Sequence, residues 1–81
     1  MTKQKFNEIV KELRVMFNNL NGSVKVEEGE TRALVECRTK EMILETAKEK
    51  KYLHGALISC DNYSIKTEND ELVIVLGFEW K

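Results

Sequence analysis

Three side chains in the second half of the chain could supply acid–base or thiol chemistry. His54 is the single histidine, and Cys60 and Asp61 follow it closely. A thiol, an imidazole and a carboxylate make up a cysteine nucleophile with its base and its orienting acid. Such sets are normally assembled from residues far apart in the sequence. A small enzyme or ligand site around His54, Cys60 and Tyr63 is therefore the weakest hypothesis, and we expect His54 near a helix C-terminus, where the dipole favours it.

Metal, redox and cofactor chemistry find little support in the sequence. Cys37 and Cys60 are the two cysteines, and they form neither a CxxC pair nor a ligand cluster with the lone histidine. We interpret both as small, half-buried apolar residues in a reducing compartment. Nucleotide-binding, hydrolase, metalloprotease and EF-hand motifs are missing from the sequence. We therefore predict a non-enzymatic protein without a metal or a cofactor.

Basic side chains could form a stripe that binds nucleic-acid phosphates. The candidate residues are Lys3, Lys11, Arg14, Arg32 and Arg38. Acidic residues interleave with them, and the formal net charge is −1. Nucleic-acid binders usually carry a clear basic excess, so a nucleic-acid-binding module is the alternative function and not the favoured one.

Acidic clusters stand at two turns. They could bind a cation or a basic partner, although most such turns are simply solvated. The first contains Glu27, Glu28 and Glu30, and the second contains Asn69, Asp70 and Glu71.

An amphipathic helix over residues 3–20 is the clearest predicted element. Its apolar residues recur at steps of three and four, which places them on one face. Thr2 is a suitable N-cap, and Asn21 or Gly22 can take the left-handed conformation that ends a helix. The apolar residues are Phe6, Ile9, Val10, Leu13, Met16, Phe17 and Leu20.

Two stretches of alternating apolar and polar residues predict β-hairpins. The first covers residues 23–38, with Gly29 expected to supply a positive φ at its turn. The second covers residues 62–80, with Asn69 and Asp70 at its turn.

A second helix is expected between the hairpins, with Thr39 as N-cap and Glu41 in its first turn. A helix continuing through Ile58 would place His54 in the middle of its apolar face. We therefore expect the helix to end near residues 51–55, followed by a short strand or an irregular connection.

These elements predict a single α+β domain over residues 1–81, with the order helix, hairpin, helix, hairpin. Two helices would pack in one layer against an antiparallel sheet of four strands, or of five if the connection adds one. A chain of 81 residues has a marginal core, and oligomerisation is one common source of extra stability.

The last strand is apolar on both of its faces. Leu72, Ile74, Leu76, Phe78 and Trp80 point one way, and Val73 and Val75 point the other. An open antiparallel sheet face is normally polar. Either one helix crosses to the second face, or another molecule covers it, and we favour a homodimer or a protein partner. The predicted interaction face consists of Leu34, Val73, Val75 and Trp80, although Trp80 could equally cap the core.

These observations favour a small protein-interaction or regulatory module that binds a protein partner or itself. Short chains rich in Lys, Glu and Asn are typical of accessory proteins of phages and mobile elements, which is a general expectation and not a family resemblance. The N-terminal segment is polar and contains acidic residues, so it does not resemble a secretory signal. No apolar run approaches a membrane span, and we expect a cytoplasmic location.

Overall fold

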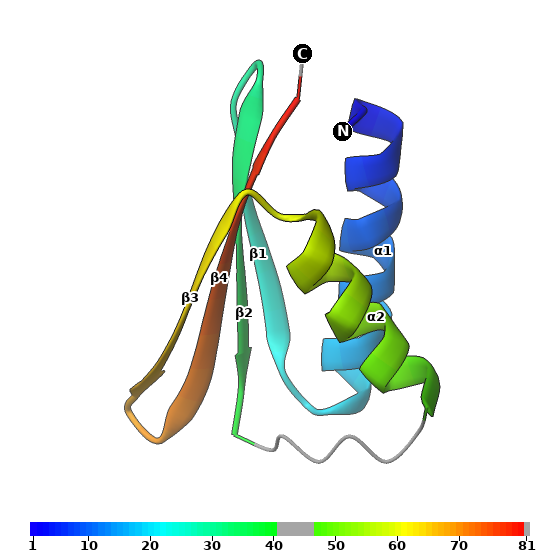
Figure 1. Ribbon diagram of the computed structural model, residues 1–81. Coiled ribbons are helices and arrows are strands. Elements are labelled where there is room, and N and C mark those ends of the chain that lie inside the picture. Colours follow the sequence, from blue (N-terminus) through cyan, green and yellow to red (C-terminus); the bar gives the residue numbers. More distant parts are fainter. Residues whose placement is uncertain (41–46, 81) are drawn as a thin grey trace.

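The computed structural model describes residues 1–40 and 47–80, and it confirms the predicted α+β architecture (Figure 1). Two helices and four strands follow one another as helix, hairpin, helix, hairpin. The elements are α1 (Lys3–Asn19), β1 (Ser23–Glu28), β2 (Arg32–Thr39), α2 (Ala47–Ser59), β3 (Asn62–Glu68) and β4 (Glu71–Glu79).

Helix α1 begins and ends where the sequence indicates. The Thr2 hydroxyl oxygen accepts a hydrogen bond from the Lys5 backbone N–H at 3.1 Å, which satisfies one of the free amides of the first turn. After the last turn Asn21 takes a φ of 54°, in the left-handed region where asparagine is tolerated. The Gly22 amide then donates to the Phe17 carbonyl at 2.7 Å and closes the helix end.

The four strands form one antiparallel sheet in the order β1-β2-β4-β3. The apolar strand β4 is therefore central, and β1 and β3 are the edges. Asn69 and Asp70 have φ values of 52° and 64°, the pair of positive values that a tight two-residue hairpin turn requires. The expectation for Gly29 was wrong: its φ is not positive, and its amide closes the turn by donating to the Arg32 carbonyl at 2.7 Å.

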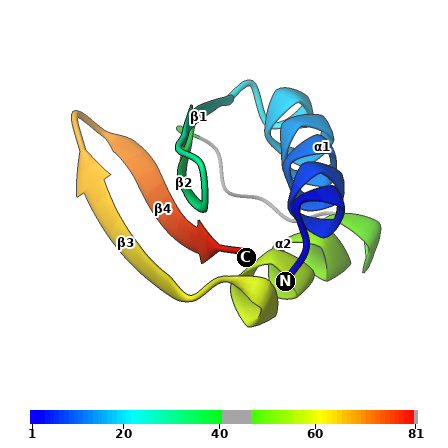
Figure 2. The ribbon, with the colours of Figure 1, turned by 90° about the horizontal axis from the view of Figure 1, so that it is seen from above.

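Both helices lie on the same face of the sheet, so the molecule has two layers (Figure 2). Helix α1 packs on β1 and β2, and α2 packs beside α1. The core between the layers combines the apolar face of α1 with the inward-facing residues of β2 and β4. Its members include Phe6, Ile9, Leu13, Met16, Phe17, Val35, Cys37, Ile74, Leu76 and Phe78.

The predicted C-terminal end of the second helix was wrong. Helix α2 continues to Ser59, because a narrow face around the buried Ala56 is enough to hold it. His54 and Ile58, one turn apart, both stay exposed, so the expected conflict does not arise. Thr39 ends β2, and its hydroxyl donates to the Leu20 carbonyl at 2.9 Å; the helix start that it was predicted to cap falls among residues 41–46, which the structure does not describe. Glu41 lies outside the described residues.

Candidate interaction surface

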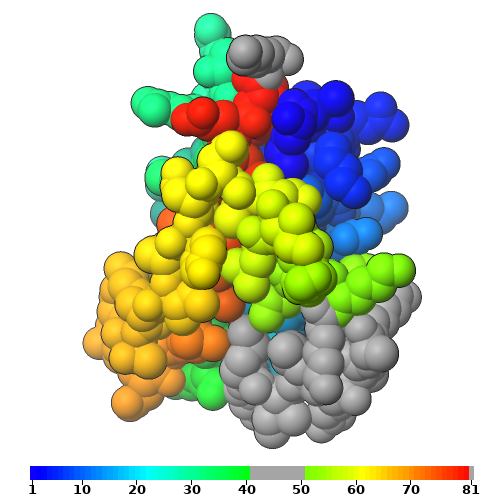
Figure 3. Space-filling model, in the orientation of Figure 1, coloured from blue at the N-terminus to red at the C-terminus, as the bar shows by residue number. Residues whose placement is uncertain are grey.

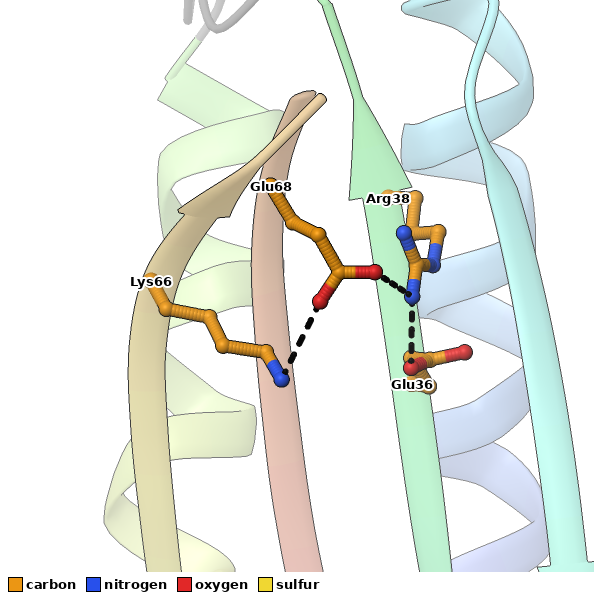
Figure 4. A network of polar contacts seen from close by, with 4 residues as sticks. All are labelled: Glu36, Arg38, Lys66 and Glu68. Carbon is orange, nitrogen blue, oxygen red and sulfur yellow. Dashed lines mark hydrogen bonds and ion pairs between the residues drawn. The ribbon is translucent and has the colours of Figure 1, made fainter. Parts of the chain in front are cut away.

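The sheet face that points away from the helices is largely closed by the chain's own charged side chains. Val73 of β4 lies between Arg38 of β2 and Lys66 of β3 in the strand register. The Arg38 guanidinium bonds to Glu36 at 3.1 Å and to Glu68 at 3.2 Å, and Lys66 pairs with Glu68 at 3.4 Å. Figure 4 shows this network reaching from β3 across β4 to β2. Long charged side chains cover apolar surface with their aliphatic stems, and Val73 is 0% exposed.

The predicted apolar patch on this face is therefore smaller than expected. Val73 is buried beneath the network, Val75 is half-buried, and Leu34 alone of the three is exposed. Gly77 stands opposite Leu34 in the register, so no side chain extends the patch in that direction. A closed outer face needs no second molecule to cover it, which removes the original reason for placing an interface there.

Trp80 belongs to the core and not to the outer face. Its ring lies 4.8 Å from that of Phe6, and Lys3 Nζ is 4.7 Å from its centroid. The indole N–H donates to the Glu30 carbonyl at 3.1 Å, which satisfies the polar end of the side chain. Trp80 therefore seals one end of the core, which is the second of the two roles that the sequence allowed, and it does not share a surface with Leu34.

Two of the exposed large apolar side chains lie together on the edge strand β3, whereas others, such as Ile58 on α2, stand singly. Every residue of Asn62–Glu68 is exposed, although Tyr63 and Ile65 lie on the same side of the sheet as the helices. Both are more than half exposed, at 58% and 55%. Figure 2 shows β3 at the border of the sheet, away from α1, and Figure 3 shows its yellow to orange surface uncovered at the left of the molecule. Two large apolar side chains on an uncovered edge are the feature that a binding hypothesis has to explain.

Sequence reasoning did not place Tyr63 or Ile65 on an interaction face: it named Tyr63 only for a small ligand site, and it predicted the alternation of both residues with Ser64 and Lys66. The pattern of β3 resembles that of a strand with one buried face. Its exposure follows from the strand order, because β3 is the edge strand farthest from α1.

The five basic residues do not form one surface. Lys3 pairs with Glu28 at 2.6 Å, and the Arg14 guanidinium donates to the Val24 carbonyl at 3.0 Å, so both are held along β1. Arg38 is held in the network on the outer face of the sheet. Lys11, on helix α1, and Arg32, on the outer face of β2, are exposed. The basic residues proposed to bind nucleic acid are thus divided between the helix layer and the outer face of the sheet.

His54, Cys60 and Asp61 have separate surroundings. His54 is exposed on α2. The Cys60 thiol donates to the Leu57 carbonyl at 3.2 Å, and an Asp61 carboxylate oxygen accepts from the Glu79 amide at 2.6 Å. Within the described ranges no hydrogen bond joins the three side chains, so the geometry gives a thiol–base–acid site no support.

The two thiols differ in accessibility, which predicts their reactivity. Burial raises the pKa of Cys37 to about 12, against a smaller lowering effect of Arg14, and partial burial also raises the pKa of Cys60. Thiolates are the reactive form. In a Cys60→Ser variant we expect no reaction of Cys37 with Ellman's reagent at pH 8 and complete reaction in urea. Rapid labelling of Cys37 in the native protein would contradict its placement in the core.

The ion network predicts a loss of stability in acid. Hydrogen bonds from Arg38, and then from Lys66, lower the pKa of Glu68. A lowered pKa in the folded state stabilises the protein above the unfolded-state pKa, and this stabilisation disappears as the pH falls through the folded-state value. Glu68→Gln should therefore flatten the decline of the urea midpoint in this acid range. Glu12→Gln, at an exposed position on α1, is the control, and an equal flattening there would contradict the assignment.

An open hollow of about 500 Å³ lies over Gly77 on the outer face, and its lining includes Leu34, Asn62, Arg32 and Glu79. Buried side-chain polar atoms in the described part of the chain all have partners, so none is aimed at a missing ligand.

Among residues 1–40 and 47–80, no three His, Cys, Asp or Glu side chains are placed to hold a metal ion. The described helices include none with the length and hydropathy of a membrane span. No family model matches the sequence, and no curated protein or solved structure matches it either.

Proposed function

We propose that the protein acts by binding another polypeptide chain along the free edge of β3. The observation that supports this function is the exposure of all seven β3 residues, Tyr63 and Ile65 included. A strand at the edge of a sheet presents a row of unpaired N–H and C=O groups, which is a template for a further strand. Backbone hydrogen bonds would supply the pairing, and the two apolar side chains would supply buried area.

The other edge of the sheet is less suited to this role. Along β1 the Val24 carbonyl accepts a hydrogen bond from Arg14, and Glu28 pairs with Lys3, so side chains of α1 are attached to this edge. Among the described residues no side chain bonds to the β3 backbone in this way. The two edges of one sheet therefore differ, and the difference favours β3 as the binding edge.

β3 has few of the features that usually prevent another strand from pairing with the edge of a sheet. Proline, β-bulges, inward-pointing charges and exposed lysines oppose the addition of a strand. The sequence NYSIKTE contains no proline and no glycine. Its two charged residues, Lys66 and Glu68, pair with each other on the outer face, and the helix side of the strand carries Tyr63, Ile65 and Thr67.

Affinity capture with matched baits tests this function. The wild-type protein, an Ile65→Lys variant and a Leu34→Ser variant are used side by side, because Ile65 and Leu34 are exposed to a similar degree on different faces. A partner that binds wild type and Leu34→Ser but not Ile65→Lys supports the edge of β3. A partner lost with Leu34→Ser and kept with Ile65→Lys would move the function to the outer face and refute the proposal.

A further inference from the structure

We infer that the occupant of the β3 edge is the β3 strand of a second copy of the chain, paired antiparallel about a two-fold axis at Ser64. This inference rests on the proposed function and names the partner. Two-fold pairing of identical strands is isologous, so every contact occurs twice. The product would be a continuous sheet of eight strands, with the two β3 strands at its centre.

The sequence of β3 is self-complementary in this register. When Ser64 faces Ser64 of the second copy, Tyr63 faces Ile65 and Ile65 faces Tyr63. Both pairs lie on the helix side of the sheet, because Tyr63 and Ile65 pair with inward-facing β4 residues. Aromatic residues opposite β-branched residues are among the stabilising cross-strand pairs. The two large apolar residues that the monomer leaves exposed on this edge would thus cover each other.

Charge placement favours the same register over its neighbours. With Ser64 on the axis, Lys66 faces Asn62 and Thr67 faces Asp61, so no like charges oppose each other. Moving the axis to Lys66 would place two lysines directly opposite, which is destabilising. Moving it to Ile65 would make the two lysines diagonal neighbours. A shift of the register by one residue would turn Tyr63 towards polar residues of the other face.

The arrangement of the layers leaves room for the second copy. Both helices lie on one face, with α1 over β1 and β2, and the free edge of β3 points away from α1 (Figure 2). Neighbouring strands are about 4.7–4.9 Å apart, so the second β3 would lie beyond the border of the first molecule. The helices of both copies would remain on the same side of the joined sheet, since the two-fold axis is perpendicular to it.

Disulfide trapping tests both the partner and the register. Directly opposed residues of antiparallel strands have Cα atoms about 4.5–5.5 Å apart, within the range that a disulfide spans. In a Cys60→Ser background, Ser64→Cys should form a covalent dimer under mild oxidation. The control is Ser23→Cys, an exposed serine on the outer face of the other edge strand, which should cross-link at least tenfold more slowly. Equal rates for the two variants, or faster trapping of Ile65→Cys, would overturn the inference.

Light scattering separates this inference from the proposed function. Concentrated wild-type protein should approach twice the 9.4 kDa mass of one chain. Ile65→Lys should raise the dissociation constant at least tenfold, with an unchanged circular dichroism spectrum. A monomer at every concentration, together with a different partner captured through β3, would refute self-pairing and retain the proposed function. A monomer without β3-dependent capture would refute both.

Discussion

Phe6→Ala is expected to lower the free energy of unfolding by about 3–5 kcal/mol, the usual cost of truncating a buried phenylalanine. Phe6 is almost fully buried. Its ring packs edge-on against Phe78, with centroids 5.4 Å apart, and lies beside Trp80 at 4.8 Å. Such aromatic pairs add about 0.5–1.5 kcal/mol beyond burial. A domain of this size has a total stability of about 4–12 kcal/mol, so a large part of it would be lost.

Urea unfolding followed by the fluorescence of Trp80, the single tryptophan, measures this effect directly. The control is Val15→Ala on the same helix, at a position that is about half exposed. There we expect a change within about 0.5 kcal/mol, since surface substitutions rarely exceed this range. A loss below about 1 kcal/mol for Phe6→Ala would be incompatible with the packing of α1 on β4.

Gly22→Ala is expected to be the most damaging of the glycine substitutions. A Cβ atom at this position would overlap the Arg38 carbonyl oxygen and press on the Thr39 side chain at 3.1 Å. The overlapped atom is backbone, so it cannot move away by changing a rotamer. Overpacking costs about 1–3 kcal/mol, and we expect the upper end of that range. The urea midpoint should fall accordingly.

Gly55→Ala is the control, and we expect it to increase the stability of the protein. Gly55 lies inside α2, and nothing stands within 4 Å of the Cβ that alanine would add. Alanine is favoured over glycine in a helix interior by about 0.8–1.0 kcal/mol, so the urea midpoint should rise. A Gly22→Ala midpoint that stayed unchanged or rose with that of Gly55→Ala would disprove the close approach of Gly22 to the end of β2.

Local patterns were sufficient to predict most of the fold. The α1 stripe, its Thr2 cap and the turn at Asn69 and Asp70 each have a short-range cause, and all three agree with the structure. The predicted end of α2 was wrong because the length of this helix depends on how many of its residues pack against α1. That number is set by packing and cannot be obtained from the local sequence.

The candidate surface depended on the order of the strands, which local patterns do not contain. Placing β4 at the centre allows Arg38 and Glu68 to meet across it and to cover Val73. The same order leaves β3 at the edge and exposes Tyr63 and Ile65. The exposed apolar residues of β3 therefore lie on the opposite side of the sheet from the face predicted from β4, for a reason that lies in long-range pairing.

Hydrogen exchange of the β3 backbone amides, measured at low and at high protein concentration, tests the central claim most directly. Amides that point away from β4 should exchange rapidly in the dilute protein and become protected as the concentration rises. Amides along the free edge of β1 should not change. Equal exchange of the β3 amides at both concentrations, or protection that develops at β1 instead, would contradict the pairing of β3 with a second copy of the chain.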